Sequence, residues 1–201
     1  MRIEFIKNYF LRNYRLLLIS LFIFIIFFIV GIFNGYSSVG GNTGQISQNA
    51  YSIGNISLST GGLTSWDLFI NNFLVGLRIF LGGFLFSLYS IFLVITNALT
   101  IGAPFGVDFT FASVTIIPHS IFEYPALIFA LTGAFLITKI EIGIIRSFMS
   151  VDKSVSESIN ESKVMMKDIV LSFIIMLILL IVAALIEGNL TAPFAMWFYN
   201  A

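Results

Sequence analysis

The sequence predicts an all-α membrane protein, a polytopic transmembrane helical bundle of about five spans with a cytoplasmic N-terminus and the C-terminus outside. Of its 201 residues, 58% are hydrophobic and only 10% are charged, which leaves too little polar surface for a soluble domain. Several apolar runs approach the roughly 20 residues that a helix needs to cross a bilayer, and such runs exclude a transmembrane β-barrel. Lysine and arginine gather beside some runs and are missing beside others, which orients the spans.

The first predicted span covers residues 16–34. Basic residues precede it, and the positive-inside rule places them in the cytoplasm: Arg2, Lys7, Arg12 and Arg15. Residues 35–66 then carry no charge and are rich in Gly, Ser, Asn and Thr. Because this composition cannot bury a core, we predict a flexible outer loop.

The next apolar stretch is too long for one ordinary span and short for two. The segment 102–117 holds no cation. The apolar run after that segment is followed by a group of cations: Lys139, Arg146, Lys153, Lys163 and Lys167. This charge pattern requires an even number of crossings between the outer loop and that segment. We predict a short span over 67–81, a turn at Gly82 and Gly83, and a return span over 84–101. One long helix followed by a re-entrant stretch through 102–117 satisfies the same parity.

The second half of the chain is predicted to cross the membrane twice. Residues 118–138 form the fourth span, which runs inward, and residues 168–187 form the fifth, which runs outward. Between them, residues 139–167 hold charges of both signs with apolar positions at spacings of three and four. This pattern predicts a cytoplasmic amphipathic helix or helical hairpin against the membrane. The charge-free tail 188–201 is expected at the outer interface, where aromatic side chains are favoured.

The most unusual feature is the single histidine, which lies in an apolar segment one helical turn before a carboxylate. His119 and Glu123 share one face of a helix at this spacing, and Pro125 leaves a backbone carbonyl free between them. The predicted topology places both on the outward half of the bundle, at the depth of Asn97 and Glu187. These four side chains are therefore predicted to form an outward polar cluster.

Three interpretations of the cluster stay open. Its members join helices by hydrogen bonds, or they form a proton relay or solute-binding pocket, or they bind a metal. A single histidine without any cysteine makes the metal site the weakest of the three. Catalysis would need Ser120 or Ser113 oriented by His119, and the spacing does not favour this. No catalytic residue, metal site or cofactor is predicted.

Arg78 is the one cation inside the second span. It either extends to the inner surface or pairs with Glu123. Other residues are predicted to break helices or allow close helix packing: Pro118, Pro125, Gly82, Gly83 and Gly102.

Three groups of residues together resemble a known family. One is the proline–histidine segment with its following glutamate and second proline: Pro118, His119, Glu123, Pro125 and Ala126. Another is Asn97 with Gly102, which follow the Gly82–Gly83 pair. The third is the run from Ala183 to Glu187, followed by Thr191 and Pro193. From about residue 71 to residue 193, the chain is similar to the stage II sporulation protein M family. The family often has glycine where this chain has Ser120.

The resemblance implies a multi-spanning protein with its amino end inside, and its namesake is a membrane scaffold that gathers peptidoglycan-degrading partners. We therefore expect a non-enzymatic, multi-pass scaffold or anchor in the cell membrane. Its expected partners are the lipid bilayer and other membrane or envelope proteins, without nucleic acid; homo-oligomerisation stays open. The alternatives are a permease or channel-like protein that uses His119 and Glu123, and a metal-dependent membrane hydrolase.

Overall fold

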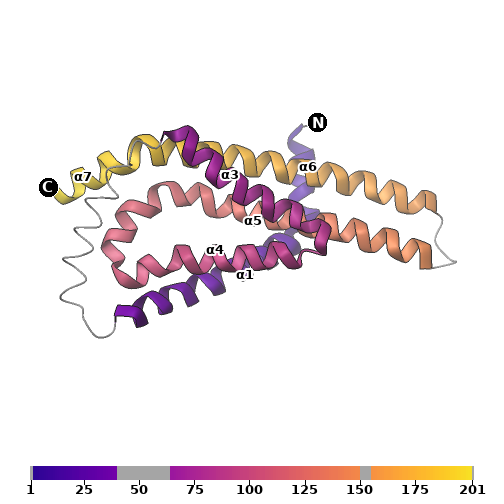
Figure 1. Ribbon diagram of the computed structural model, residues 1–201. Coiled ribbons are helices and arrows are strands. Elements are labelled where there is room, and N and C mark those ends of the chain that lie inside the picture. Colours follow the sequence, from indigo (N-terminus) through magenta and orange to yellow (C-terminus); the bar gives the residue numbers. More distant parts are fainter. Residues whose placement is uncertain (1, 40–63, 150–154, 201) are drawn as a thin grey trace.

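The computed structural model describes residues 2–39, 64–149 and 155–200, and Figure 1 shows helices packed side by side along one long axis. Within these ranges no strand occurs. In chain order the elements are α1 (Arg2–Val39), α3 (Ser65–Leu81), η1 (Gly82–Leu85), α4 (Leu88–Val107), α5 (Phe109–Met149), α6 (Val155–Ile186), η2 (Glu187–Thr191) and α7 (Ala192–Asn200). Of these, η1 is a 3₁₀ turn and η2 is a π-helical turn.

Within the described ranges, five helical segments are long and apolar enough to cross a membrane. They are Glu4–Val39, Ser65–Leu85, Leu88–Val107, Phe109–Arg146 and Ser162–Tyr199. The predicted fold class, an all-α polytopic bundle of about five spans, is confirmed. The protein is a multi-pass membrane protein. Which end faces the cytoplasm stays a prediction from charge.

The apolar stretch up to residue 101 forms two helices joined by a tight turn. The turn extends beyond the predicted Gly82–Gly83 pair, because Phe86 and Ser87 both adopt left-handed backbone angles with φ of 51° and 57°. A Cβ on Gly83 would lie 2.7 Å from the carbonyl oxygen of Ala134. Thr138 donates to the Gly83 carbonyl at 2.9 Å and bonds to Ser87 at 2.6 Å. Glycine thus allows the turn to press directly on α5.

Helices α1 and α4 run beside each other and meet through glycines spaced four residues apart on each helix (Figure 1). A Cβ on Gly31 would lie 2.5 Å from the carbonyl oxygen of Leu99, and one on Gly35 would collide with Ala103. From the other side, Gly102 and Gly106 face the backbone of α1 in the same way. The predicted packing role of Gly102 thus has a partner helix. Such small-residue stripes allow membrane helices to approach closely.

Neither proline breaks α5, contrary to the helix-breaking role predicted for them. Pro118 and Pro125 both lie inside the continuous helix, and Figure 1 shows α5 curving through its first half. A proline removes one backbone hydrogen bond and kinks a helix, while packing against neighbouring helices preserves the rest. The segment 102–117 is also helical except at Asp108. Its carboxylate accepts from the backbone N–H of Phe111 at 2.9 Å and begins the helix.

Other segments differ in extent from their predicted bounds. The predicted outer loop begins later, since α1 continues to Val39, and most of the loop lies outside the described residues. The tail 188–201 is largely helical, as the end of η2 and α7. The described parts of the segment 139–167, which was predicted to be cytoplasmic, are the end of α5 and the beginning of α6, and these two helix ends extend beyond the rest of the bundle (Figure 1).

The core lies between α3, α4, α5 and α6, with Phe24 of α1 closing one side. Its fully buried side chains are mainly branched or small apolar groups, among them Ile79, Val94, Ala130, Leu131, Met176 and Leu180. Small residues on α5 let the neighbouring helices approach, and their larger side chains fill the spaces between.

Candidate functional site

Helix α5 places His119 and Glu123 on one face, as predicted from their spacing. The Nε2 atom of His119 lies 3.9 Å from Oε2 of Glu123, and the two side chains are only 11% and 18% exposed. An imidazole and a carboxyl that are this far withdrawn from solvent need polar partners within the protein. The pair is therefore the centre of a buried polar site.

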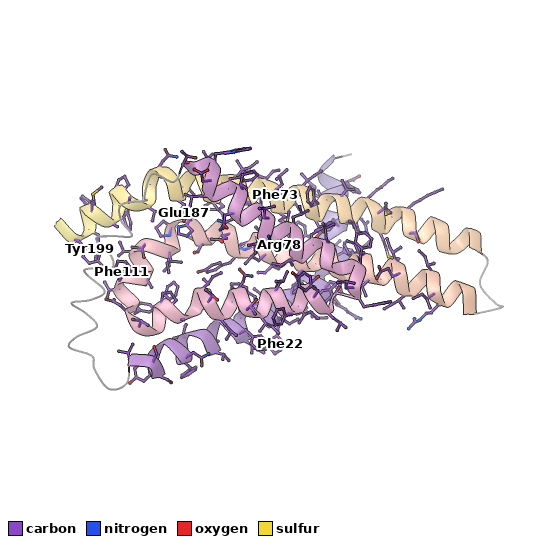
Figure 2. The ribbon with its side chains drawn as sticks, viewed as in Figure 1. Phe22, Phe73, Arg78, Phe111, Glu187 and Tyr199 are labelled. Atoms are coloured by element: carbon purple, nitrogen blue, oxygen red, sulfur yellow. The ribbon has the colours of Figure 1, made fainter. Side chains whose placement is uncertain are left out.

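The π-helical turn η2 provides the second side of this site. Thr191 Oγ1 lies 3.5 Å from Nδ1 of His119 and also 3.4 Å from the carbonyl oxygen of Ile186. Glu187, labelled in Figure 2, opens the same turn. Glu187 and Thr191 are four residues apart, so their side chains are neighbours on the surface of this turn. This geometry lets η2 face α5 with both polar side chains.

The same turn is held from behind by the first residues of α3. Asn189 donates to Ser65 Oγ at 3.2 Å and to the carbonyl of Leu185 at 2.8 Å. Gly188 packs so closely on Ser65 that an added Cβ would lie 3.0 Å from the Cβ of that serine. Thr64 and Asp67 close the N-terminus of α3 with a reciprocal capping box. Helices α3, α5 and α6 are thereby joined at one end of the bundle.

Two predicted residues stand apart from this site: Asn97, a predicted member of the cluster, and Arg78, a possible ion-pair partner of Glu123. Asn97 donates to the Leu93 carbonyl of its own helix at 2.7 Å, and among the described residues no hydrogen bond joins it to the histidine pair. Arg78 is exposed near the end of α3 and makes no ion pair with a described residue, so the pairing with Glu123 is not formed. Arginine carries its charge outward along a flexible apolar stem, which removes the need for a buried partner.

Two features that are common in hydrolytic sites are not seen among the described residues. Within the described ranges, no three His, Cys, Asp or Glu side chains are grouped closely enough to hold a metal ion. Neither Ser113 nor Ser120 makes a hydrogen bond to His119 in the described part of the chain, as an activated serine would. The arrangement can hold helices together, and it can exchange a proton between an imidazole and a carboxyl.

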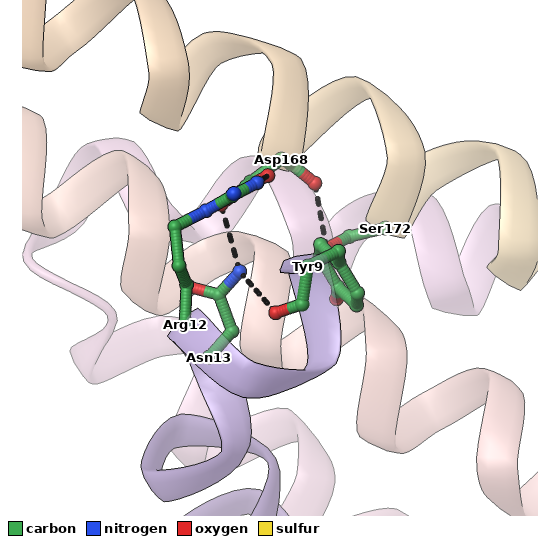
Figure 3. A network of polar contacts seen from close by, with 5 residues as sticks. All are labelled: Tyr9, Arg12, Asn13, Asp168 and Ser172. Atoms are coloured by element: carbon green, nitrogen blue, oxygen red, sulfur yellow. Dashed lines mark hydrogen bonds and ion pairs between the residues drawn. The ribbon is translucent and has the colours of Figure 1, made fainter. Parts of the chain in front are cut away.

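A second polar network, absent from the sequence-based predictions, joins the beginning of α1 to α6 (Figure 3). Arg12 donates to both oxygens of Asp168, from Nε at 3.1 Å and from Nη2 at 2.6 Å. Asn13 donates to the same carboxylate at 2.8 Å and to the Tyr9 carbonyl at 3.0 Å. The Tyr9 hydroxyl bonds to Ser172 Oγ at 2.7 Å, and Ser172 donates to the Asp168 carbonyl at 3.0 Å. We call these five residues the inner network.

The inner network explains the path of α1. The first turns of α1 cross α5 and α6, and the rest then runs beside α4 (Figure 1). Tyr9 stacks on Phe129 with ring centroids 6.4 Å apart, and Ser20 bonds to Thr132 at 3.1 Å, so 11 residues of α1 pass over less than one turn of α5. One sequence signal could have found the network: Asp168 is an acid at the edge of the last apolar run, with Arg12 at the edge of the first.

Comparison with family models decides the family. Stage II sporulation protein M is the family whose model matches, over residues 6–192. The chain belongs to the stage II sporulation protein M family. Searches of the curated proteins and of the solved structures gave no match. The resemblance predicted from the sequence is confirmed. The family match also begins far earlier than residue 71, so this member's inner network and its histidine site both lie within it.

Proposed function

We propose that this stage II sporulation protein M family member is a scaffold in the cell membrane that anchors envelope-associated partner proteins. Family membership supports a membrane protein of this kind. The observation that carries the proposal further is that the histidine site is buried and contacts η2. His119 and Glu123 are mostly buried and linked to η2, so they hold the end of the bundle in one shape. A rigid surface loses little conformational entropy when a partner binds.

The contact surface that we propose is the same end of the bundle, where two tryptophans project outward. Trp66 in the first turn of α3 and Trp197 in α7 are each 66% exposed. Large aromatic side chains are favoured both at protein interfaces and at the membrane boundary. With the predicted orientation, this surface faces the envelope side of the membrane, within reach of envelope proteins.

Site-specific photocrosslinking in native membranes tests the proposal. A photoreactive amino acid is placed at Trp66 or Trp197, and as a matched control at Phe22, which is 65% exposed on the membrane-spanning part of α1 (Figure 2). We expect crosslinks to envelope proteins from the two tryptophan positions and none from the control. Equal crosslinking from all three positions, or recovery of the chain alone together with normal localisation of envelope proteins after its deletion, would contradict a scaffold.

A permease or channel-like function is the second candidate, favoured by the contact of His119 with both Glu123 and Thr191 inside a spanning helix. Paired ionisable groups beside an irregular helix are typical of transport sites. Solute or proton flux in proteoliposomes tests it, with His119→Ala and Glu123→Gln as variants and Asn97→Ala as a control outside the pair. Flux that both variants leave unchanged would reject this candidate.

A further inference from the structure

A basic cleft opens between α1 and α5 beside the inner network. It has a volume of about 400 Å³ and is lined by Arg12, Tyr14, Arg15, Leu16 and Lys139. Three of these five residues are cations, and none is an acid. Pockets of this size, from about 300 Å³ upward, accommodate small ligands or headgroups. The lining favours a ligand with negative charge.

Two of the three cations are available to such a ligand. The Arg12 guanidinium is already occupied by Asp168. Arg15 donates from Nε to the Tyr14 hydroxyl at 3.0 Å and lies 5.7 Å over the ring of that tyrosine. This contact orients the guanidinium and leaves its terminal nitrogens without a described partner. Lys139 is exposed and makes no ion pair with a described residue. Glu141 is two positions along α5, a spacing at which side chains do not face each other.

The cleft lies at the edge of the hydrocarbon layer. Arg15 immediately precedes the apolar run of α1, and Lys139 immediately follows that of α5. From Arg15 an exposed apolar stripe continues along the same face of α1, through Leu18 and Phe22. A phosphate bound by Arg15 and Lys139 would therefore have an apolar surface directly beside it for an acyl chain. Free phosphate has no acyl chain, so this apolar surface would not contribute to its binding.

We propose that this cleft binds the headgroup phosphate of an anionic phospholipid, with Arg15 and Lys139 as its ligands and Leu18 and Phe22 along an acyl chain. Arginine suits phosphate through its planar pair of donors, and lysine adds a compact charge. Basic pockets between spanning helices are a recurrent way of holding acidic headgroups. The site is separate from the histidine site and does not depend on the scaffold function.

Lipid titration of the purified full-length protein, followed by native mass spectrometry, tests the proposal. The probes are phosphatidylglycerol, phosphatidylcholine with the same acyl chains, and inorganic phosphate as a competitor. The test variant is Arg15→Gln/Lys139→Gln. The matched control is Lys7→Gln/Arg146→Gln, which removes two exposed cations elsewhere on the same two helices. Thermal unfolding in detergent verifies that both double variants are folded, and because all four side chains are exposed, both should retain the wild-type midpoint.

We expect phosphatidylglycerol to bind the wild type and the control equally, and the test variant about 10- to 30-fold more weakly, from the attraction of each basic residue to acidic lipid. Phosphatidylcholine should bind the wild type as weakly as phosphatidylglycerol binds the test variant. Equal weakening in the control would show that only net charge matters and would overturn the proposal. Displacement of the lipid by inorganic phosphate at matched concentration would identify a free-anion site and would also overturn it.

Discussion

The ion pair between Arg12 and Asp168 is expected to contribute strongly to stability, and unequally from its two sides. The Asp168 side chain is 3% exposed, whereas that of Arg12 is 38% exposed. Replacing Arg12 with Met keeps an apolar stem of similar length but leaves a buried carboxylate with only Asn13 as donor. Replacing Asp168 with Asn keeps the side-chain shape and leaves Arg12 free to reach water.

The magnitude follows from the two charge-assisted bonds that Arg12 donates. Each contributes about 1.5–3 kcal/mol when charge is involved, and solvent screening of the exposed guanidinium reduces the sum to about 2–4 kcal/mol for Arg12→Met. Asp168→Asn should cost about 1–2 kcal/mol, since no charge is left buried. The double variant removes the stranded carboxylate, so its loss should fall short of the sum by about 1–3 kcal/mol.

Reversible unfolding in mixed detergent micelles measures these free energies as a double-mutant cycle. Arg15→Met is the matched control: among the described residues the Arg15 guanidinium bonds to its neighbour Tyr14 alone, so its loss should cost less than about 0.5 kcal/mol. If the effects of Arg12→Met and Asp168→Asn add within about 0.5 kcal/mol, the two residues are not coupled and the reasoning is refuted.

Two further predictions concern helix packing and orientation. Gly31→Ala places a Cβ 2.5 Å from the Leu99 carbonyl oxygen and should lower the free energy of unfolding by about 1–3 kcal/mol. The control Gly143→Ala, with nothing within 4 Å of its added Cβ, should be neutral or stabilising. Equal effects of the two substitutions would contradict close packing of α1 on α4. The chain has no cysteine, so Trp66→Cys, at a position that is 66% exposed, should react with an impermeant maleimide on intact cells. Arg146→Cys should react only after the membrane is opened, and the reverse pattern would invert the predicted orientation.

Much of the fold was predictable because membrane insertion depends on local composition. Apolar length identified the spans, and the glycine pair at 82 and 83 marked the turn between α3 and α4. The bounds were less accurate. Gly102 and Pro118 were expected near helix ends, yet both lie inside helices. In a bilayer the backbone has no water to bond with, so helices continue through residues that would end them in solution.

The candidate site was predictable only where its geometry is local. His119 and Glu123 meet because they are four residues apart on one helix, and Glu187 was placed near them by depth alone. Thr191 was named only as part of the family resemblance, and it lies 72 residues from His119 in the sequence, so residue spacing does not reveal their contact. Asn97 was placed at the same depth, but depth does not state which way a side chain points.

The sequence by itself determined that this chain is a helical membrane protein of about five spans and that a histidine and a carboxylate share one helix face. Apolar run length and residue spacing are local properties, readable along the chain. Only the tertiary structure decided that Arg12 meets Asp168 across 156 residues and that α1 crosses two helices before joining α4. Such contacts depend on how helix surfaces fit together, because hydrocarbon tails give helices no hydrophobic reason to prefer one neighbour over another.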